Sequence, residues 1–165
     1  SKSVARVAVM IPKGVAHAIG IVRELDPDYL QIYGFMSVAE FEEIKRATEV
    51  KIIAAIGVPQ RADQPREITA RAREVAKVAD FVLVDTKHLG VGGGMGLTHN
   101  WDVSLFVREA IHKPLILSGG LNPMNVRKAI EVVKPYGVDV ASGVEFGPGK
   151  KDPELVRKFI QIAKG

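Results

Sequence analysis

Cysteine is absent from all 165 residues of the sequence. Disulfide bonds, thiolate metal sites and a cysteine nucleophile or base are therefore excluded within this chain. No apolar run approaches the roughly 18–20 residues of a membrane-spanning helix, and no signal peptide is visible. We therefore expect no membrane partner and a cytoplasmic location.

Aromatic residues are also scarce, at 6% of the chain, and the net charge of +4 is modest. The densest basic stretch, residues 61–77, also carries Glu67 and Glu74. This mixture is typical of a solvated helix face, whereas a nucleic-acid surface needs interleaved aromatic side chains or a continuous basic stripe. We expect no nucleic-acid partner, and the positive balance suits a small anionic substrate.

Histidine and serine give little support for metal or nucleophilic chemistry. The four histidines are scattered along the chain without the spacing of metal ligands. No serine lies on a strand–turn elbow with a suitable base nearby in the pattern. We therefore expect no metal site.

Short β-rich runs alternate with longer segments of helical periodicity. The expected strands are residues 5–11, 29–33, 51–56, 81–85, 114–117 and 138–142. The expected helices are residues 13–25, 37–48, 65–78, 103–111, 123–134 and 153–164. Near-continuous apolar strands alternating with helices predict one α/β domain over residues 1–165 with a parallel sheet. Asn122 and Asp152 each precede a proline and are expected to cap the helices that follow.

Six such βα units fit either an open doubly wound sheet or a closed barrel. An open sheet usually carries its glycine fingerprint after the first strand, whereas barrels commonly bind phosphate after their last two strands. The glycine turns of this chain follow the last two strands, which favours the parallel (βα)8 barrel. At about 30 residues a unit, two further units do not fit in this chain, so the expected barrel is incomplete.

The two glycine turns predict an anion site. Each follows an apolar run, and they contain Gly119 and Gly120 in one case and Ser142 and Gly143 in the other. Glycine lets the main chain approach a ligand closely, and a helix start presents N–H groups with partial positive charge. Two such turns on neighbouring strands are interpreted as one phosphate site.

Asp85 closes the apolar run 81–84 and is a candidate for general acid–base work, because partial burial can raise the pKa of a carboxyl group. A carboxylate that caps the following loop is the equally weighted alternative. The loop 87–96 contains five glycines, and we expect Gly92, Gly93 and Gly94 to border the site.

Several segments together resemble phosphoribosylanthranilate isomerase, a (βα)8-barrel enzyme of tryptophan biosynthesis. The resemblance is dense from residue 81 onward and is carried by residues 82–86, 117–126, 134–145 and 151–153. It is looser at residues 29–34, where Tyr33 stands at a position at which the family commonly has histidine.

The resemblance implies an Amadori rearrangement of N-(5-phosphoribosyl)anthranilate to 1-(2-carboxyphenylamino)-1-deoxyribulose 5-phosphate, without metal or organic cofactor. It implies that Asp85 is the general acid, and that Gly119, Gly120, Ser142 and Gly143 bind the phosphate of a phosphoribosyl substrate.

The chain departs from the family pattern at its beginning. The family's general base is a cysteine on the first strand, and this chain has none. Aligned on the family, residues 5–11 correspond to the third strand, so the chain matches strands three to eight. We expect open sheet edges, little or no activity of the chain alone, and either a homo-oligomer or a complementing N-terminal fragment as partner.

Two other functions stay open at the level of sequence. One is a non-catalytic module that binds a phosphate ligand. The other is a different phosphosugar isomerase on the same fold, with Asp85 and a second group transferring protons.

Overall fold

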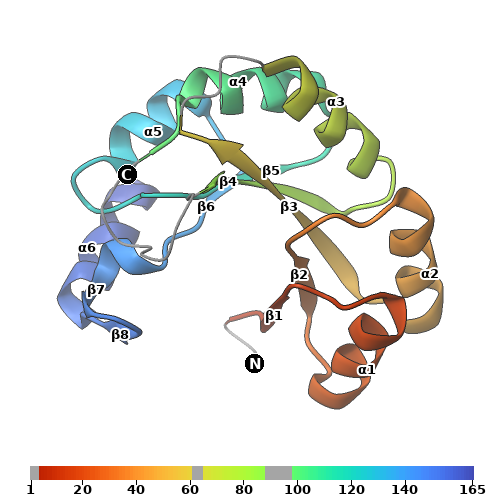
Figure 1. Ribbon diagram of the computed structural model, residues 1–165. Coiled ribbons are helices and arrows are strands. Elements are labelled where there is room, and N and C mark those ends of the chain that lie inside the picture. Colours follow the sequence, from red (N-terminus) through yellow and green to blue (C-terminus); the bar gives the residue numbers. More distant parts are fainter. Residues whose placement is uncertain (1–3, 61–64, 88–97) are drawn as a thin grey trace.

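The computed structural model describes residues 4–60, 65–87 and 98–165. Within them, six parallel strands pair in the order in which they occur along the chain (Figure 1). The strands are β1 (Val7–Met10), β2 (Tyr29–Ile32), β3 (Lys51–Pro59), β4 (Phe81–Lys87), β5 (Leu115–Leu117) and β6 (Gly137–Val138). The helices are α1 (Val15–Leu25), α2 (Val38–Thr48), α3 (Pro65–Val75), α4 (Trp101–Ala110), α5 (Val126–Val133) and α6 (Pro153–Lys164).

The helices lie along the outer side of a curved sheet, and the strands line its inner side (Figure 1). Such a sequential parallel order confirms the expected α/β arrangement of βα units. Within the described residues, β1 and β6 stand at the two ends of the sheet and pair with one strand each. In the described part of the chain, no helix is long and apolar enough to cross a membrane.

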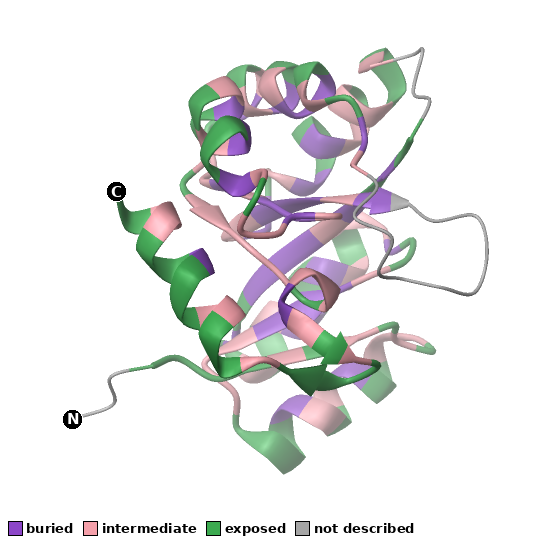
Figure 2. Cartoon of the chain, turned by 90° about the vertical axis from the view of Figure 1, so that its left-hand side faces the viewer, coloured by how far each residue is buried: buried purple, intermediate pink, exposed green. Residues whose placement is uncertain are grey.

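Successive side chains of each strand point alternately to the helices, where the core lies, and to the inner face of the sheet. Val82 and Val84 on β4 are fully buried and pack in a cluster with helix residues such as Val107 and Ala129. Because successive side chains of a strand point to opposite faces, Asp85 points to the inner side. The buried residues accordingly gather on the strands and on the helix faces that cover them (Figure 2).

Two predicted helix starts have different outcomes. The prediction that Asp152 caps α6 is confirmed, because its Oδ1 accepts hydrogen bonds from the backbone N–H groups of Glu154 (2.8 Å) and Leu155 (3.2 Å). The prediction that Asn122 caps the helix that follows it, α5, is wrong. Its side chain accepts from the N–H of Met124 instead, and α5 begins only at Val126.

The segment after β6 also differs from expectation. The predicted strand 138–142 ends after Val138, and Ser142–Val144 form a short 3₁₀ helix. An antiparallel pair then follows, β7 (Glu145–Gly147) with β8 (Lys150–Lys151). Its strands are too short to give a periodic pattern, and it is fastened by an ion pair of 2.6 Å between Lys151 Nζ and Glu145 Oε1.

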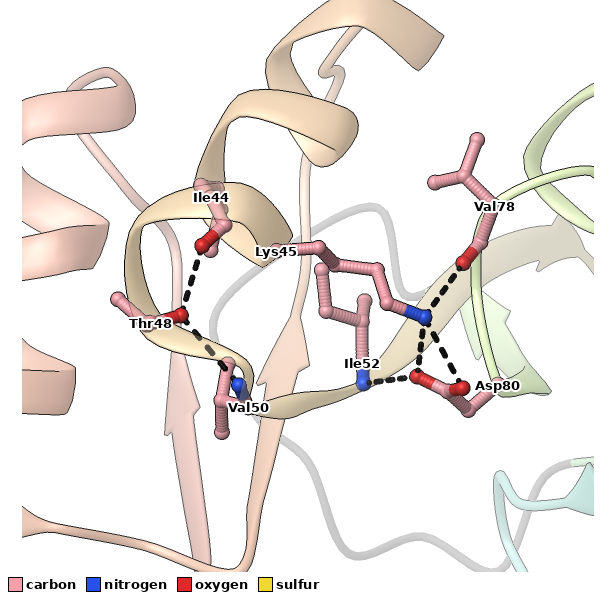
Figure 3. A network of polar contacts seen from close by, with 7 residues as sticks. All are labelled: Ile44, Lys45, Thr48, Val50, Ile52, Val78 and Asp80. Carbon is pink, nitrogen blue, oxygen red and sulfur yellow. Dashed lines mark hydrogen bonds and ion pairs between the residues drawn. The ribbon is translucent and has the colours of Figure 1, made fainter.

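Asp80 links the beginnings of two strands to a helix (Figure 3). Its carboxylate accepts a hydrogen bond of 2.8 Å from the N–H of Ile52 and bonds of 2.9 and 3.0 Å from the Lys45 ammonium group. Lys45 Nζ also donates to the carbonyl of Val78 at 3.1 Å. Burial by itself raises the pKa of Asp80, but the Ile52 hydrogen bond and the Lys45 charge outweigh it and hold the pKa below its ordinary value.

We expect Asp80→Asn to lower the free energy of unfolding by about 1.5–3 kcal/mol at pH 7, the range for hydrogen bonds to charged groups. A depressed native pKa means that the unfolded state takes up its proton first as pH falls. The stabilisation is therefore complete above the ordinary pKa of 3.8 and is lost as pH falls through the lower native value.

Urea unfolding at pH 7 and at steps from pH 5 to 2 measures this difference between wild type and variant. Glu43→Gln, on the exposed face of α2, is the control and should stay within about 0.5 kcal/mol of wild type. A difference between wild type and Asp80→Asn that stays constant down to pH 2 contradicts the assignment.

Candidate active site

A cavity of about 190 Å³ lies at the carboxyl ends of the parallel strands. Its walls come from β4 and from the segments that follow β2, β5 and β6. They are formed by Tyr33, Asp85, Ser118, Gly119, Gly120, Leu121, Asp139, Val140, Ala141, Ser142 and Gly143. The structure therefore brings Asp85 and both glycine turns together around one cavity. The polar ends of parallel strands meet at this edge because all six strands point the same way.

The two glycine turns pack against each other through positions that exclude a side chain. Gly119 has a φ of 90°, and a Cβ added there would overlap the backbone nitrogen and side chain of Thr86. A Cβ added at Gly143 would overlap the carbonyl oxygen of Leu121. The first turn thus lies directly against the end of β4, and the second turn lies directly against the first.

Asp85 is half-buried at the end of β4 and accepts a hydrogen bond of 2.9 Å from the Tyr33 hydroxyl to its Oδ2. Gln31 Nε2 in turn donates to the Tyr33 oxygen at 3.3 Å. Burial, followed by the negative charge of Asp85, raises the pKa of Tyr33 above its ordinary value. Tyr33 therefore stays protonated and donates its hydrogen to the carboxylate.

Asp139 is a second carboxylate in the cavity wall, and the sequence interpretation did not include it. Its Oδ2 accepts a hydrogen bond of 2.9 Å from Ser118 Oγ, and its N–H donates to the carbonyl of Leu117 at 2.9 Å. Its charge also contributes to the raised pKa of Tyr33. The expected strand 138–142 placed Asp139 inside a strand, whereas β6 ends at Val138 and leaves Asp139 just after the strand end.

Other candidate residues lie elsewhere. His99, which flanks the glycine loop in the sequence, is 2% exposed and lies among buried side chains between β4 and α4, and burial lowers its pKa to about 4. Gly92, Gly93 and Gly94 lie outside the described residues. No group of three or more histidine and acidic side chains that could hold a metal ion occurs in residues 4–60, 65–87 and 98–165.

A larger hollow of about 720 Å³ lies between α3 and α4, on the outer side of the molecule. Arg66, Arg73 and Phe106 are among the residues that line it. None of the site residues predicted from the sequence lines it, and the lining residues in the described part of the chain all lie on these two outer helices. The smaller cavity is therefore the candidate active site.

Comparison with known proteins gives the family of the chain. Residues 1–162 match the family model described as N-(5'phosphoribosyl)anthranilate (PRA) isomerase.

The chain belongs to this family.

The PRA isomerase of Methanothrix thermoacetophila is 49% identical over 155 residues, which make up 94% of this chain and 70% of that protein. The PRA isomerase of Haloferax volcanii is 42% identical over 156 residues, which make up 94% of this chain and 66% of that protein. The chain thus spans about two thirds of the length of these relatives.

Solved PRA isomerase structures share the fold. The Thermotoga maritima enzyme superposes with a TM-score of 0.84 at 34% identity, over 100% of this chain and 75% of that one. Another, in complex with reduced 1-(o-carboxyphenylamino)-1-deoxyribulose 5-phosphate, gives a TM-score of 0.80 at 32% identity, over 100% of this chain and 74% of that one. The expectations of an isomerase family and a barrel-type fold are confirmed.

We expect Gly119→Ala and Gly143→Ala each to lower the free energy of unfolding by about 1–3 kcal/mol, because the added methyl group has no room. The matched control is Gly137→Ala on β6, where an added Cβ meets nothing within 4 Å, and we expect a change within about 0.5 kcal/mol. Urea unfolding of the three variants checks this. Equal effects at all three positions would show that the turns are not closely packed.

Proposed function

We propose that this chain carries the general acid and the phosphate site of PRA isomerase, which converts N-(5-phosphoribosyl)anthranilate to 1-(2-carboxyphenylamino)-1-deoxyribulose 5-phosphate. One observation carries the proposal: in a member of this family, Asp85 and both glycine turns line the same cavity. The substrate has one phosphate and one reacting sugar ring, which matches an anion site beside a carboxyl group.

In the proposed reaction, the protonated form of Asp85 gives the proton on Oδ1 to the furanose ring oxygen and becomes a carboxylate, while Oδ2 accepts the hydrogen bond from Tyr33. The bond between that oxygen and C1 breaks, and the anthranilate nitrogen lone pair forms a protonated Schiff base. A base then removes the C2 proton, the electron pair moves toward nitrogen, and the resulting enolamine tautomerises to the ketone. The hydrogen bond from Tyr33 holds Asp85 Oδ2 in a fixed direction for the first step.

The phosphate group is proposed to bind between Gly119 and Gly120 on one side and Ser142 and Gly143 on the other. Positive φ values of 90° at Gly119 and 68° at Gly120 turn the backbone in a way that L side chains rarely permit. Without side chains at these positions, main-chain N–H groups can approach phosphate oxygens closely. The Ser142 hydroxyl adds a further donor in the same wall.

These 165 residues do not supply the general base that the family uses, because that base is a cysteine and they contain none. Two observations support the proposal that catalysis needs further βα units. β1 and β6 each have one sheet neighbour in the described part of the chain. Val7 and Val9 on β1 are 43% and 59% exposed, although valine is usually buried. A second copy of the chain or a complementing fragment could supply these βα units.

A cytoplasmic location of the protein stays a prediction.

A second candidate function is a different phosphosugar isomerase in which Asp139 is the proton-transfer partner of Asp85. The presence of the Asp139 carboxylate in the cavity favours it. Activity of the chain alone on an aldose phosphate, lost in Asp139→Asn, would identify this function.

The test is growth of a strain that lacks PRA isomerase on medium without tryptophan. We expect growth when the chain is expressed with a fragment that supplies the first two βα units of a relative, and little or none with the chain alone. In the complemented enzyme, Asp85→Asn should lower kcat by at least about 100-fold, as for loss of a general acid. Asp102→Asn, on the exposed start of α4, is the matched control.

Growth with the chain alone would contradict the proposal that the chain lacks a general base. Unchanged kcat in Asp85→Asn would instead overturn the acid assignment.

A further inference from the structure

His99 forms a buried polar chain with Thr86 and Ser104 that does not reach the cavity. Its Nδ1 lies 2.8 Å from Thr86 Oγ1, its backbone N–H donates to the same oxygen at 3.1 Å, and its Nε2 lies 2.6 Å from Ser104 Oγ. The exposed fractions of Thr86, His99 and Ser104 are 3%, 2% and 0%. Three residues from two elements and a connecting segment are therefore joined without access to water.

Either neutral form of the His99 ring satisfies both hydroxyl groups. Thr86 Oγ1 accepts from the backbone N–H of His99 and still has a proton and a second lone pair, so its bond to Nδ1 forms in either direction. Nε2 takes the opposite role toward Ser104 Oγ in each case. Neutral histidine fits this arrangement, and burial lowers its pKa to about 4, so it stays neutral at physiological pH.

Thr86 connects the hydrogen-bonded group of Thr86, His99 and Ser104 to the candidate active site. It follows Asp85 directly, and its backbone nitrogen and side chain fill the space that a Cβ of Gly119 would need. On the side of β3, Asp85 and Thr86 are paired with Gly57 and Val58. On the side of β5, the paired residues end at Val84. Beyond Val84 on that second side, Thr86 lies against Gly119, and its hydroxyl group bonds to His99.

We propose that His99 is a positioning residue, which fixes Thr86 and thereby places Asp85 and the first phosphate turn relative to each other. The inference rests on the proposed function for the roles of Asp85 and Gly119. His99 itself does not line the cavity, so it acts through Thr86 and does not touch the substrate.

Substitutions that mimic one ring nitrogen at a time separate positioning from simple packing. The amide of asparagine lies near the place of Nδ1 and can keep the Thr86 bond, whereas the amide of glutamine lies near the place of Nε2 and can keep the Ser104 bond. Thr86→Val preserves the shape of Thr86 and removes its hydroxyl. His112→Gln is the control, because His112 is exposed beyond the end of α4.

We expect amide hydrogen exchange at Asp85 and Gly119 to be at least tenfold faster in His99→Gln and Thr86→Val than in wild type. The amide of Leu30 on β2 is the internal reference. His99→Asn should restore exchange to within threefold of wild type, and His112→Gln should not change it. Affinity for inorganic phosphate should fall in the same two variants, by about tenfold, and recover in His99→Asn.

Unchanged exchange at Asp85 and Gly119 in folded Thr86→Val would overturn the inference, as would equal effects of His99→Asn and His99→Gln. If His99→Gln does not fold, Thr86→Val decides alone. Absence of phosphate binding in the wild type would be a failure of the proposed function, and the exchange measurement would still decide the role of His99.

Discussion

The whole site depends on the close contact of backbone with backbone at the carboxyl edge of the sheet. Gly119 lies against Thr86 at the end of β4, and Gly143 lies against the carbonyl of Leu121 in the first turn. Neither contact leaves room for a single methyl group. The two turns and the acid strand are consequently held at one spacing, and that spacing defines the cavity into which Asp85 and Asp139 point.

The two faces of β4 carry residues with different roles, core packing on one face and the proposed chemistry on the other. Val82 and Val84 face the helices and lie in the buried core, while Asp85 faces the inner side and bonds to Tyr33. Thr86 returns to the helix side, where His99 holds it. Alternation thus places the acid next to a residue that is anchored in the interior, so the position of a polar side chain at the cavity is set by packing on the opposite face.

Much of this arrangement could be predicted from the sequence because it depends on local patterns. Apolar runs gave the strands, and the Asp152–Pro153 pair gave the start of α6. The similar Asn122–Pro123 pair did not predict the start of α5. The N–H of Asn122 bonds to Asn125 Oδ1, and the side chain of Asn122 accepts from the N–H of Met124, so these residues form a turn that ends before α5. The burial of His99 was not predictable, since Thr86 lies 13 residues away in the sequence and only the fold brings the two together. Asp139 was missed because the expected strand 138–142 placed it inside a strand, whereas β6 ends at Val138.

The central claim is that the two glycine turns form one phosphate site beside Asp85. The most direct measurement is an amide NMR titration of the wild-type chain with 1-(2-carboxyphenylamino)-1-deoxyribulose 5-phosphate. We expect the largest shifts to occur together, with one binding curve, at Gly119, Gly120, Ser142 and Gly143, accompanied by Asp85. Shifts confined to one turn, or centred on the hollow between α3 and α4, would contradict the claim.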